Sequence, residues 1–287
     1  MNVYKHKAYA KINLTLEIVG VEEKYHVLDS LVASVALCDE IKIKKRADDY
    51  STVRMQGMGS EHIPTGDNNA VKAALAFSKR FKTCGVDITI KKNIPLGGGL
   101  GGSSADAAGV LYAMSKLYEV NDTAALEQLA ESLGSDTKYM LTGGYKRMQG
   151  RGERLTDTGI DTTLNLLLLC PSTSVSAGAC YKKYDELPKT LQWLESATDG
   201  CIQALQTGDM QQAIMHIRND LYVPALQLNQ DVGKAMEEMQ ELHPTALGMT
   251  GSGSCVFGIF PSMRAVNAAK KKYNGDFLAI ATRTVSP

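Results

Sequence analysis

Apolar and polar residues alternate along the start of the chain. Every second residue from position 8 to position 18 is apolar, and Lys11, Asn13 and Glu17 stand between them. A period of two residues predicts a β-strand whose side chains point in turn to opposite faces. Lys11 and Asn13 are therefore expected to point to the same side of that strand.

A second alternating stretch predicts another strand at residues 86–90, which runs through Pro95 into a glycine tract. Before it, apolar residues at helical spacing predict a helix over residues 70–81. Asp67 or Asn68 would cap that helix, because short polar side chains accept hydrogen bonds from the amides of a first turn.

After the glycines, apolar residues recur at helical spacing between residues 107 and 117. This pattern predicts a helix that begins near Ser103 or Ser104, with Asp106 in its first turn. Strand, glycine loop and helix thus follow one another, and the loop is expected to end on the amino terminus of a helix.

A further helix is predicted over residues 123–133, with Asn121 or Asp122 as its cap and Gly134 at its carboxyl end. Asp136 follows this stop almost directly. At such a position a short acidic side chain can project away from the helix.

The rest of the chain mixes helices and strands without regular alternation or an internal repeat, which predicts the α+β class. A change of pattern near residues 150 to 160 divides the chain into an amino-terminal domain, residues 1–155, and a carboxyl-terminal domain, residues 156–287. No linker rich in proline or serine separates them, so we expect packed domains with a cleft between them. The elements predicted in the second half are strands at 164–169, 255–260 and 277–285, and helices at 191–205, 210–217 and 232–242.

The charge balance excludes several classes of protein. The 287 residues include 31 lysines and arginines and 31 aspartates and glutamates, so no net field attracts nucleic acid or anionic lipid. The apolar runs are shorter than the roughly 18 residues of a membrane helix, and the amino terminus has no signal or transit pattern. We therefore expect a soluble, cytoplasmic protein without a nucleic-acid or membrane partner. The composition does not indicate an oligomeric state.

The cysteines are scattered without a CxxC pair, and no histidine or cysteine cluster has the spacing of a metal site. This distribution is typical of reduced thiols rather than of a disulfide framework or a zinc site. We expect mostly buried thiols and no metal held by protein side chains alone. The six are Cys38, Cys84, Cys170, Cys180, Cys201 and Cys255.

The glycine tract is the most informative segment for function. Glycines permit positive φ angles and have no Cβ to keep a ligand away from the amides. The helix that follows adds unpaired amides and the positive end of its dipole, and its serines add hydroxyls for a phosphate oxygen or Mg²⁺. The tract therefore predicts a phosphate-binding loop. Its candidate residues are Pro95, Gly97, Gly98, Gly99, Leu100, Gly101, Gly102, Ser103, Ser104 and Ala105.

Three alternatives to this interpretation fit less well. A Walker loop requires Gly-Lys-Ser/Thr after its glycines, and no lysine stands there. Gly97, Gly99 and Gly102 match the GxGxxG of a dinucleotide fold, with Asp122 about 20 residues further on. That loop usually follows the first strand, however, whereas a strand and a helix precede it here. A flexible linker would not lie between a clear strand and a clear helix.

Three separated segments resemble the GHMP small-molecule kinases. Pro95-x-x-x-Gly99-Leu100 leading into Ser103-Ser104-Ala105 is similar to their phosphate loop, and Thr-Gly-Ser-Gly-Ser-Cys-Val-Phe at residues 250–257 is similar to their third motif. Ala-Lys-Ile-Asn-Leu-Thr-Leu at residues 10–16 resembles the branch that phosphorylates the 2-hydroxyl of diphosphocytidyl methylerythritol in the non-mevalonate route to isoprenoid precursors. Residues 25–28, 37–41, 66–68, 133–136, 150–155, 175–176, 181 and 219–221 contribute to the same resemblance.

This resemblance covers nearly the whole chain and carries several expectations. It implies a two-domain GHMP kinase fold with the active site in the interdomain cleft. It implies ATP as cosubstrate, Mg²⁺ that arrives with ATP, and a cytidine diphosphate-linked polyol as the small-molecule substrate. Asp136 would be the catalytic base that orients and deprotonates the accepting hydroxyl. Lys11, beside Asn13 at the substrate, would keep that carboxylate ionised and stabilise charge on the transferred phosphate.

The resemblance also implies residues for the two nucleosides. Tyr25 and Tyr181 would stack on the cytosine ring while His26 reads its polar edge, and Asn68 would reach the nucleoside of ATP. Taken singly, a buried tyrosine or histidine is more often plain core, and an asparagine before a helix is often a cap. Both interpretations stay open for these four residues.

The chain departs from the family's usual pattern near two of these residues. Glu23-Lys24 stands where Asp-Gly is usual before Tyr25, and Thr137-Lys138 stands where Val-Pro is usual after Asp136. Lys138 is therefore expected to add a positive charge close to the catalytic carboxylate. Two alternatives remain: a divergent GHMP kinase for another small alcohol, and a nucleotide-binding regulatory protein without catalytic activity.

Overall fold

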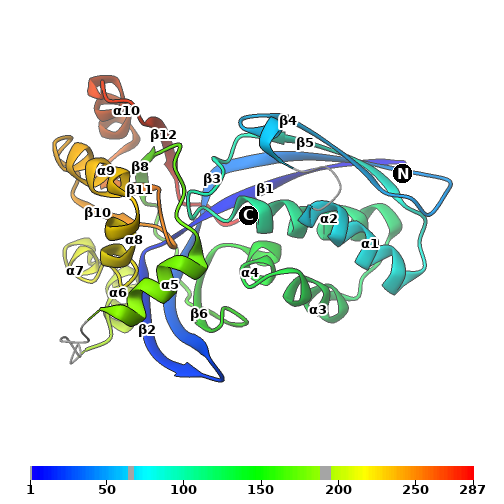
Figure 1. Ribbon diagram of the computed structural model, residues 1–287, viewed down its shortest axis with the longest axis horizontal. Helices are drawn as coiled ribbons and strands as arrows, with labels where there is room; N and C mark the ends of the chain where they lie inside the picture. The colour runs from blue at the N-terminus through cyan, green and yellow to red at the C-terminus, as the bar shows by residue number, and fades with distance from the viewer. Residues whose placement is uncertain (1, 64–67, 188–194) are drawn as a thin grey trace. The chain divides into compact units, whose positions relative to one another are not determined.

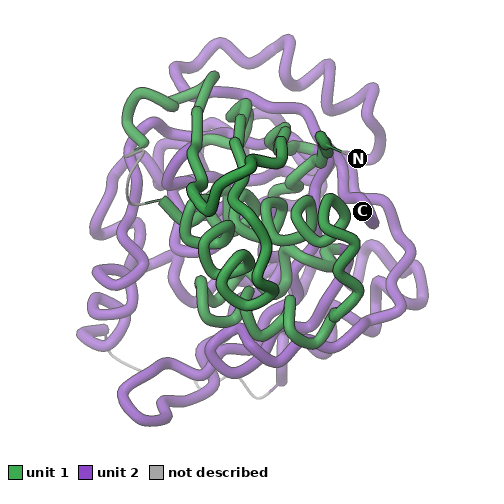
Figure 2. Tube along the Cα trace, turned by 90° about the vertical axis from the view of Figure 1, so that its right-hand side faces the viewer, with its two compact units in different colours: residues 1–10, 37–95, 101–143 green, residues 11–36, 96–100, 144–287 purple. Residues whose placement is uncertain are grey.

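The structure, a computed structural model, describes residues 2–63, 68–187 and 195–287. The chain forms two compact units, each built from several stretches of sequence (Figures 1 and 2). Unit 1 comprises residues 1–10, 37–95 and 101–143, and unit 2 comprises residues 11–36, 96–100 and 144–287. Strands β1 (Val3–Asn13) and β3 (Tyr25–Lys45) contribute residues to both units. A division at residues 155 and 156 and a cleft between the domains remain predictions.

Unit 1 is a sheet with helices along one face (Figure 1). The second half of β3 pairs antiparallel with β5 (Val86–Lys92), and β4 (Thr52–Gly57) lies parallel to β5. The register sets Ile41 opposite Ile90 and Ile43 opposite Ile88, and all four side chains are buried. The helices of the unit are η1 (Ser60–His62), α1 (Asn69–Phe81), α2 (Gly102–Tyr118), α3 (Thr123–Leu133) and α4 (Thr137–Thr142).

The caps of α1 and α3 confirm the sequence predictions. The Asn68 side chain accepts a hydrogen bond from the Val71 amide at 3.0 Å, and Asp122 accepts one from the Ala125 amide at 2.9 Å. Each therefore satisfies an amide that has no partner inside its helix. Asp67, the alternative cap of α1, lies outside the described residues.

Helix α2 is the central helix of unit 1, because its side chains are buried on almost every side. It begins at Gly102, a residue or two before the predicted start, and the chain enters it through Gly101 with a φ of 74°. The prediction that Asp106 lies in the first turn is wrong. Asp106 stands one turn further along and is buried.

Unit 2 contains the other part of the unit 1 sheet, which continues through β3, and a second, separate sheet. In the first, β2 (Thr15–Glu22) pairs antiparallel with the first half of β3, which also pairs with β6 (Tyr145–Gly150). Strand β7 (Arg154–Asp157) pairs with β6, and β9 (Arg218–Asn219) lies parallel to β2. The second sheet is antiparallel in the order β10-β11-β8-β12. Its strands are β8 (Asn165–Cys170), β10 (Ala246–Met249), β11 (Val256–Phe260) and β12 (Leu278–Arg283).

Helices α9 (Gln230–Gln240) and α10 (Met263–Lys272) pack on the second sheet. Leu167, Leu169 and Val256 of the sheet meet Met239 of α9 and Val266 of α10 in one buried apolar cluster. The helix predicted from residue 191 is seen over Ala197–Thr207, and residues 191–194 lie outside the described part. The other helices of the unit are α5 (Ala177–Glu186), α6 (Ala197–Thr207), α7 (Met210–Met215) and α8 (Tyr222–Leu228).

The alternating segment at the start of the chain forms two strands instead of one. β1 ends at Asn13, β2 begins at Thr15, and the chain bends at Leu14. Both faces of this segment are buried, so that Lys11 is 5% exposed and Asn13 is 4% exposed. Buried polar side chains need hydrogen-bonding partners, and the partners of Lys11 and Asn13 define the site described below.

In the described ranges, no helix has the length and apolar character needed to cross a membrane. All six cysteines are free, and four of them are buried.

Candidate active site

The middle of the glycine tract, residues 96–100, lies in unit 2 against the turn between β10 and β11. The Thr250 hydroxyl donates a hydrogen bond to the Gly99 carbonyl oxygen at 3.1 Å. The Cys255 amide donates one to the Gly98 carbonyl oxygen at 3.2 Å. The two segments whose sequences resemble separate kinase motifs are therefore in direct contact.

Packing explains why this loop needs glycine. A Cβ on Gly98 would overlap the Cys255 Sγ, and a Cβ on Gly99 would overlap the Thr250 carbonyl oxygen. Gly99 also has a φ of 75°, which favours glycine. The glycines thus let loop and turn approach each other closely, a requirement separate from any ligand.

Lys11 and Asn13 extend this cluster and point to the same side, as predicted. The Lys11 ammonium donates a hydrogen bond to Asn13 Oδ1 at 2.5 Å, and the Lys11 amide donates one to the Leu100 carbonyl oxygen at 3.0 Å. Asn13 Oδ1 also accepts from the Gly251 amide at 3.0 Å, while Asn13 Nδ2 donates to Ser30 Oγ at 2.9 Å. Unit 2 therefore holds a buried ammonium beside the loop backbone, a suitable group for binding phosphate.

The other end of the tract lies in unit 1, at the start of α2. Within the described residues no side chain caps this helix, since its cap position is Gly101. The first amides of the helix and its dipole are thus available to an anion. Ser103 is exposed at this end, and its Oγ accepts a hydrogen bond from Asn69 Nδ2 at 3.0 Å.

The other predicted loop residues differ in burial. Pro95, Leu100 and Ala105 are buried, whereas Gly97, Gly101, Gly102 and Ser104 are exposed or half-buried. Gly97 has a φ of 66°, and a Cβ there would lie 2.5 Å from the Ser174 Cβ.

Asp136 stands at the cap position of α4, half-buried, and it does not cap that helix with its side chain. It belongs to unit 1 and Lys11 belongs to unit 2, so the approach of the two side chains remains a prediction. The positive charge expected beside Asp136 is neutralised within unit 1. Lys138 forms ion pairs with Glu131 at 2.5 Å and with Glu127 at 3.7 Å, and the hydrogen bond to Glu131 is the main cause that raises the pKa of Lys138.

The residues expected at a cytidine form two ring contacts in unit 2. His26 stacks on Tyr181 with ring centroids 4.8 Å apart and an interplanar angle of 20°. His26 Nε2 lies 2.8 Å from Asp185 Oδ1. Tyr25 is 56% exposed, and the Arg151 guanidinium lies 3.8 Å from its ring centroid. The structure thus brings His26 and Tyr181 together and pairs Tyr25 with Arg151.

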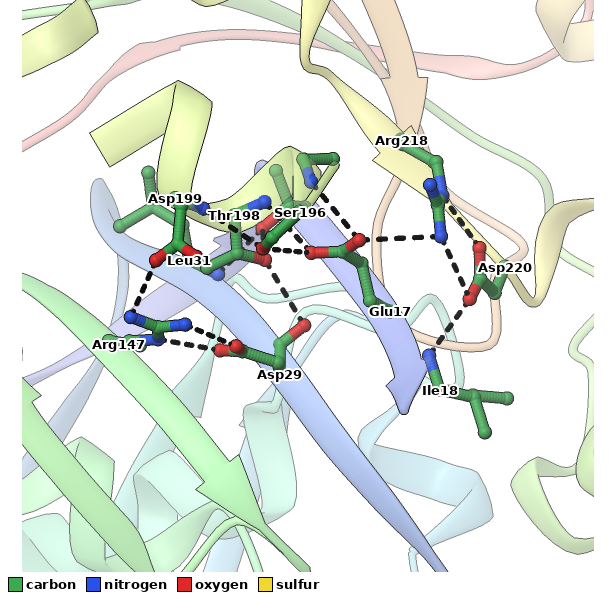
Figure 3. Close-up of polar contacts among 12 residues, drawn as sticks. Glu17, Ile18, Asp29, Leu31, Arg147, Ser196, Thr198, Asp199, Arg218 and Asp220 are labelled. Atoms are coloured by element: carbon green, nitrogen blue, oxygen red, sulfur yellow. Dashed lines mark hydrogen bonds and ion pairs between the residues drawn. The ribbon is translucent and has the colours of Figure 1, made fainter. Parts of the chain in front are cut away.

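A buried polar network anchors the β2–β3 hairpin, which carries Tyr25 and His26 (Figure 3). Glu17 on β2 accepts hydrogen bonds from amides at the start of α6, that of Thr198 at 2.8 Å, and pairs with Arg218 at 3.3 Å. Asp29 on β3 accepts from Arg147 Nε at 2.8 Å. Burial alone would raise the pKa of Glu17, but its hydrogen bonds from Thr198 and the two residues before it lower that pKa. The base of the hairpin is therefore rigidly held.

Sequence reasoning missed the Thr250 hydroxyl, Asp185 and Arg151. Thr250 lies 151 positions from Gly99, and Asp185 lies 159 positions from His26. No local pattern reports contacts over such separations. In the part of the chain that the structure describes, no group of three or more His, Cys, Asp or Glu residues could hold a metal ion.

Known proteins resemble this chain over its whole length. The family described as GHMP kinases N terminal domain matches residues 68–145, and the family GHMP kinases C terminal matches residues 201–277. The 4-diphosphocytidyl-2-C-methyl-D-erythritol kinase of Clostridium beijerinckii is 34% identical, over 98% of this chain and 100% of that protein. The kinase of the same name from Caldanaerobacter subterraneus is 34% identical, over 96% of this chain and 94% of that protein.

Solved structures agree with these relatives. A crystal structure of 4-(cytidine 5'-diphospho)-2C-methyl-D-erythritol kinase has a TM-score of 0.75 and 28% identity, covering 98% of this chain and 99% of that one. The L. major mevalonate kinase in complex with R-mevalonate has a TM-score of 0.77 at 16% identity, covering 98% and 95%. At that identity the likeness shows the fold alone.

The fold and the glycine loop therefore define an enzyme of the GHMP small-molecule kinase class. The predicted α+β fold of these kinases is confirmed. More narrowly, the chain belongs to the 4-diphosphocytidyl-2-C-methyl-D-erythritol kinase family.

Proposed function

We propose that this chain transfers the γ-phosphoryl group of ATP to the 2-hydroxyl of 4-diphosphocytidyl-2-C-methyl-D-erythritol, in the cytoplasm. The hydroxyl oxygen forms a bond to the γ-phosphorus, the bond to the β,γ-bridging oxygen breaks, ADP leaves, and the hydroxyl proton passes to a base. The observation that carries this proposal is the contact of the glycine loop with Thr250, beside the Lys11 ammonium. The full-length relatives supply the identity of the alcohol.

Each end of the loop has a separate part in the proposal. The uncapped amides of α2 bind phosphate oxygens, and the Lys11 ammonium stabilises charge on the transferred group. When bound with ATP, Mg²⁺ neutralises charge on the β- and γ-phosphates. The hydroxyls of Ser103 and Ser104 fit its preference for oxygen ligands.

Asp136 acts in this proposal as the base that orients and deprotonates the accepting hydroxyl. Asp136→Asn should lower kcat about 100-fold or more and spare ATP affinity, because a lost base affects the chemical step. Asp161→Asn, at an exposed aspartate, is a matched control that should change neither value. A wild-type kcat for Asp136→Asn would remove Asp136 from this role.

The rings of unit 2 receive the cytidine end. A carboxylate only accepts, so His26 Nε2 donates the hydrogen bond to Asp185; an imidazole that carries this single proton presents Nδ1 as an acceptor. An acceptor matches the exocyclic amino group of cytosine and not the carbonyl oxygen of uracil. Stacking against Tyr181 holds the imidazole in place, and the exposed face of Tyr25 offers a second aromatic surface for the base.

Base selectivity tests this arrangement. The wild type should favour the cytidine-linked over the uridine-linked acceptor by about 100-fold in kcat/KM, since a wrong partner leaves a polar group unpaired. Asp185→Asn should reduce the preference, because the amide no longer dictates the tautomer. Equal use of both acceptors by the wild type would contradict the assigned role of His26.

Phosphorus NMR tests the reaction itself. Purified protein with ATP, Mg²⁺ and the diphosphocytidyl alcohol should produce ADP together with a new phosphomonoester resonance, while the diphosphate signals of the acceptor persist. ATP binding without any transfer would contradict the reaction and favour a nucleotide-binding regulatory protein. Transfer only to other alcohols would favour a divergent GHMP kinase.

A further inference from the structure

A buried charged cluster lies in unit 1, and the proposed reaction assigns it no role. Lys92, at the end of β5, donates hydrogen bonds to Asp39 on β3 and to Asp106 on α2, the latter at 2.5 Å. The three side chains are 1%, 0% and 5% exposed. One ammonium thus joins three elements of the unit.

The cluster lies at both ends of the glycine tract. Asp39 Oδ1 accepts hydrogen bonds from the Asn93 amide at 2.6 Å and the Ile94 amide at 2.9 Å, directly before Pro95. On the other side, Asp106 stands in the second turn of the helix that follows the tract. A Cβ on Gly102 would lie 3.7 Å from Lys92 Nζ, so the ammonium lies next to the first residue of that helix.

This arrangement costs free energy. Two carboxylates share one buried ammonium, and Asp106 Oδ1 has no hydrogen-bond partner among the described residues. Burial raises the pKa of Asp106 to about 7, with Lys92 opposing the rise and Asp39 adding to it. Apolar residues often replace buried ion pairs without loss of stability. The cluster is therefore better explained by a need to hold its elements in place than by its contribution to stability.

We propose that Asp39, Lys92 and Asp106 are positioning residues that hold the two ends of the phosphate loop in register for ATP. This inference rests on the proposed function. Through Asp39 the cluster holds the chain entering the loop, and through Asp106 it holds the helix whose amides bind phosphate. Donors fixed in advance stabilise phosphate charge without reorganisation, and a displacement of about 1 Å can cost about 100-fold in rate.

Asp106→Leu tests the proposal. It removes one charge and the unpaired oxygen and leaves Lys92 with Asp39 as a one-to-one pair, so the fold should persist. We expect about 10-fold weaker ADP binding by calorimetry and a drop of about 10- to 100-fold in kcat/KM for ATP, with KM for the alcohol unchanged.

Two variants serve as comparisons. Asp106→Asn keeps an oxygen for Lys92 and should restore ADP affinity to within about 3-fold of wild type. Ser115→Ala removes a buried hydroxyl that bonds the Tyr112 carbonyl oxygen at 2.8 Å, at the far end of the same helix, and should leave nucleotide binding unchanged.

A folded Asp106→Leu variant with wild-type ADP affinity would overturn the proposal. If that variant does not fold, Asp39→Asn decides, because it weakens the tie to Lys92 while its amide oxygen still accepts from Asn93 and Ile94. Unchanged ADP affinity in Asp39→Asn would then overturn the proposal. ADP binding needs no acceptor alcohol, so failure of the proposed reaction and failure of this inference are distinguishable.

Discussion

The Thr250 hydroxyl connects the first strand, the phosphate loop and the β10–β11 turn. It accepts a hydrogen bond from the Asn13 amide at 3.1 Å and donates one to the Gly99 carbonyl oxygen at 3.1 Å, and Thr250 is fully buried. Thr250→Val keeps the shape of the side chain and replaces the hydroxyl with a methyl group, which forms no hydrogen bond. Loss of the acceptor for a buried amide costs about 1–3 kcal/mol, and the lost bond to Gly99 costs about 1 kcal/mol more.

Urea unfolding and ATP kinetics measure the two effects of this substitution. Thr250→Val should lower the free energy of unfolding by about 2–4 kcal/mol with an unchanged m value, and it should raise KM for ATP because the loop loses its tether. Thr250→Ser is the matched control. It keeps the hydroxyl and loses a buried methyl, which costs about 1 kcal/mol. The reasoning is refuted if Thr250→Ser is the less stable of the two, or if Thr250→Val has wild-type ATP kinetics.

Three further predictions concern other parts of the chain. Glu17→Gln should lower the free energy of unfolding at pH 7 and make it depend less on pH in the acid range. A lowered pKa stabilises the folded state above the ordinary value of 4.5, and that stability is lost as pH falls through the folded pKa. Urea unfolding over a series of pH values tests this, and parallel curves for the variant and the wild type would contradict it. Burial raises the pKa of Cys180 to about 11 and that of Cys201 to about 12. Both thiols should therefore react with a disulfide reagent at pH 8 only after the protein unfolds, and rapid labelling of either thiol in the native protein would contradict this prediction. Gly99→Ala should weaken ADP binding, because its Cβ would overlap the Thr250 carbonyl oxygen. Gly159→Ala is the control: Gly159 has a φ of 66° and lies in open space, so the substitution should cost only about 1–2 kcal/mol of backbone strain and leave ADP binding unchanged. Equal effects of the two substitutions on ADP binding would contradict the packing argument.

Elements with one apolar and one polar face were predictable from the sequence. Helix α1 buries Ala70, Ala73, Ala74 and Phe77 at helical spacing, and β5 alternates buried residues with half-buried or exposed ones. The first half of strand β3 was not predictable, because residues 29–35 are all buried, among them Asp29, Ser30 and Ser34, and so lack a period of two. Its second half does alternate, at residues 39–44. The partner that makes burial of Asp29 tolerable, Arg147, is 118 positions away.

The candidate site was predictable to the extent that it is local. The shared face of Lys11 and Asn13 follows from strand geometry alone. Asp106 was misplaced because a helix start after consecutive glycines has no sequence marker to distinguish Gly102 from Ser103. Its partner Lys92 is 14 positions away, on another element, so no local pattern reports their contact.

Substitutions of the loop glycines cannot distinguish a kinase from a nucleotide-binding regulatory protein, because the contacts of these glycines are needed in both. Gly98 and Gly99 are required for the loop to approach Cys255 and Thr250, whether or not phosphate is transferred. A protein that only binds nucleotide would need the same glycines, so damage to ATP binding by a glycine substitution is expected under both functions. Transfer requires in addition a group that takes the hydroxyl proton, and binding does not. Asp136→Asn therefore discriminates where the glycines cannot. Only a kinase predicts measurable transfer by the wild type that falls about 100-fold or more in the variant while ATP binding stays at the wild-type level.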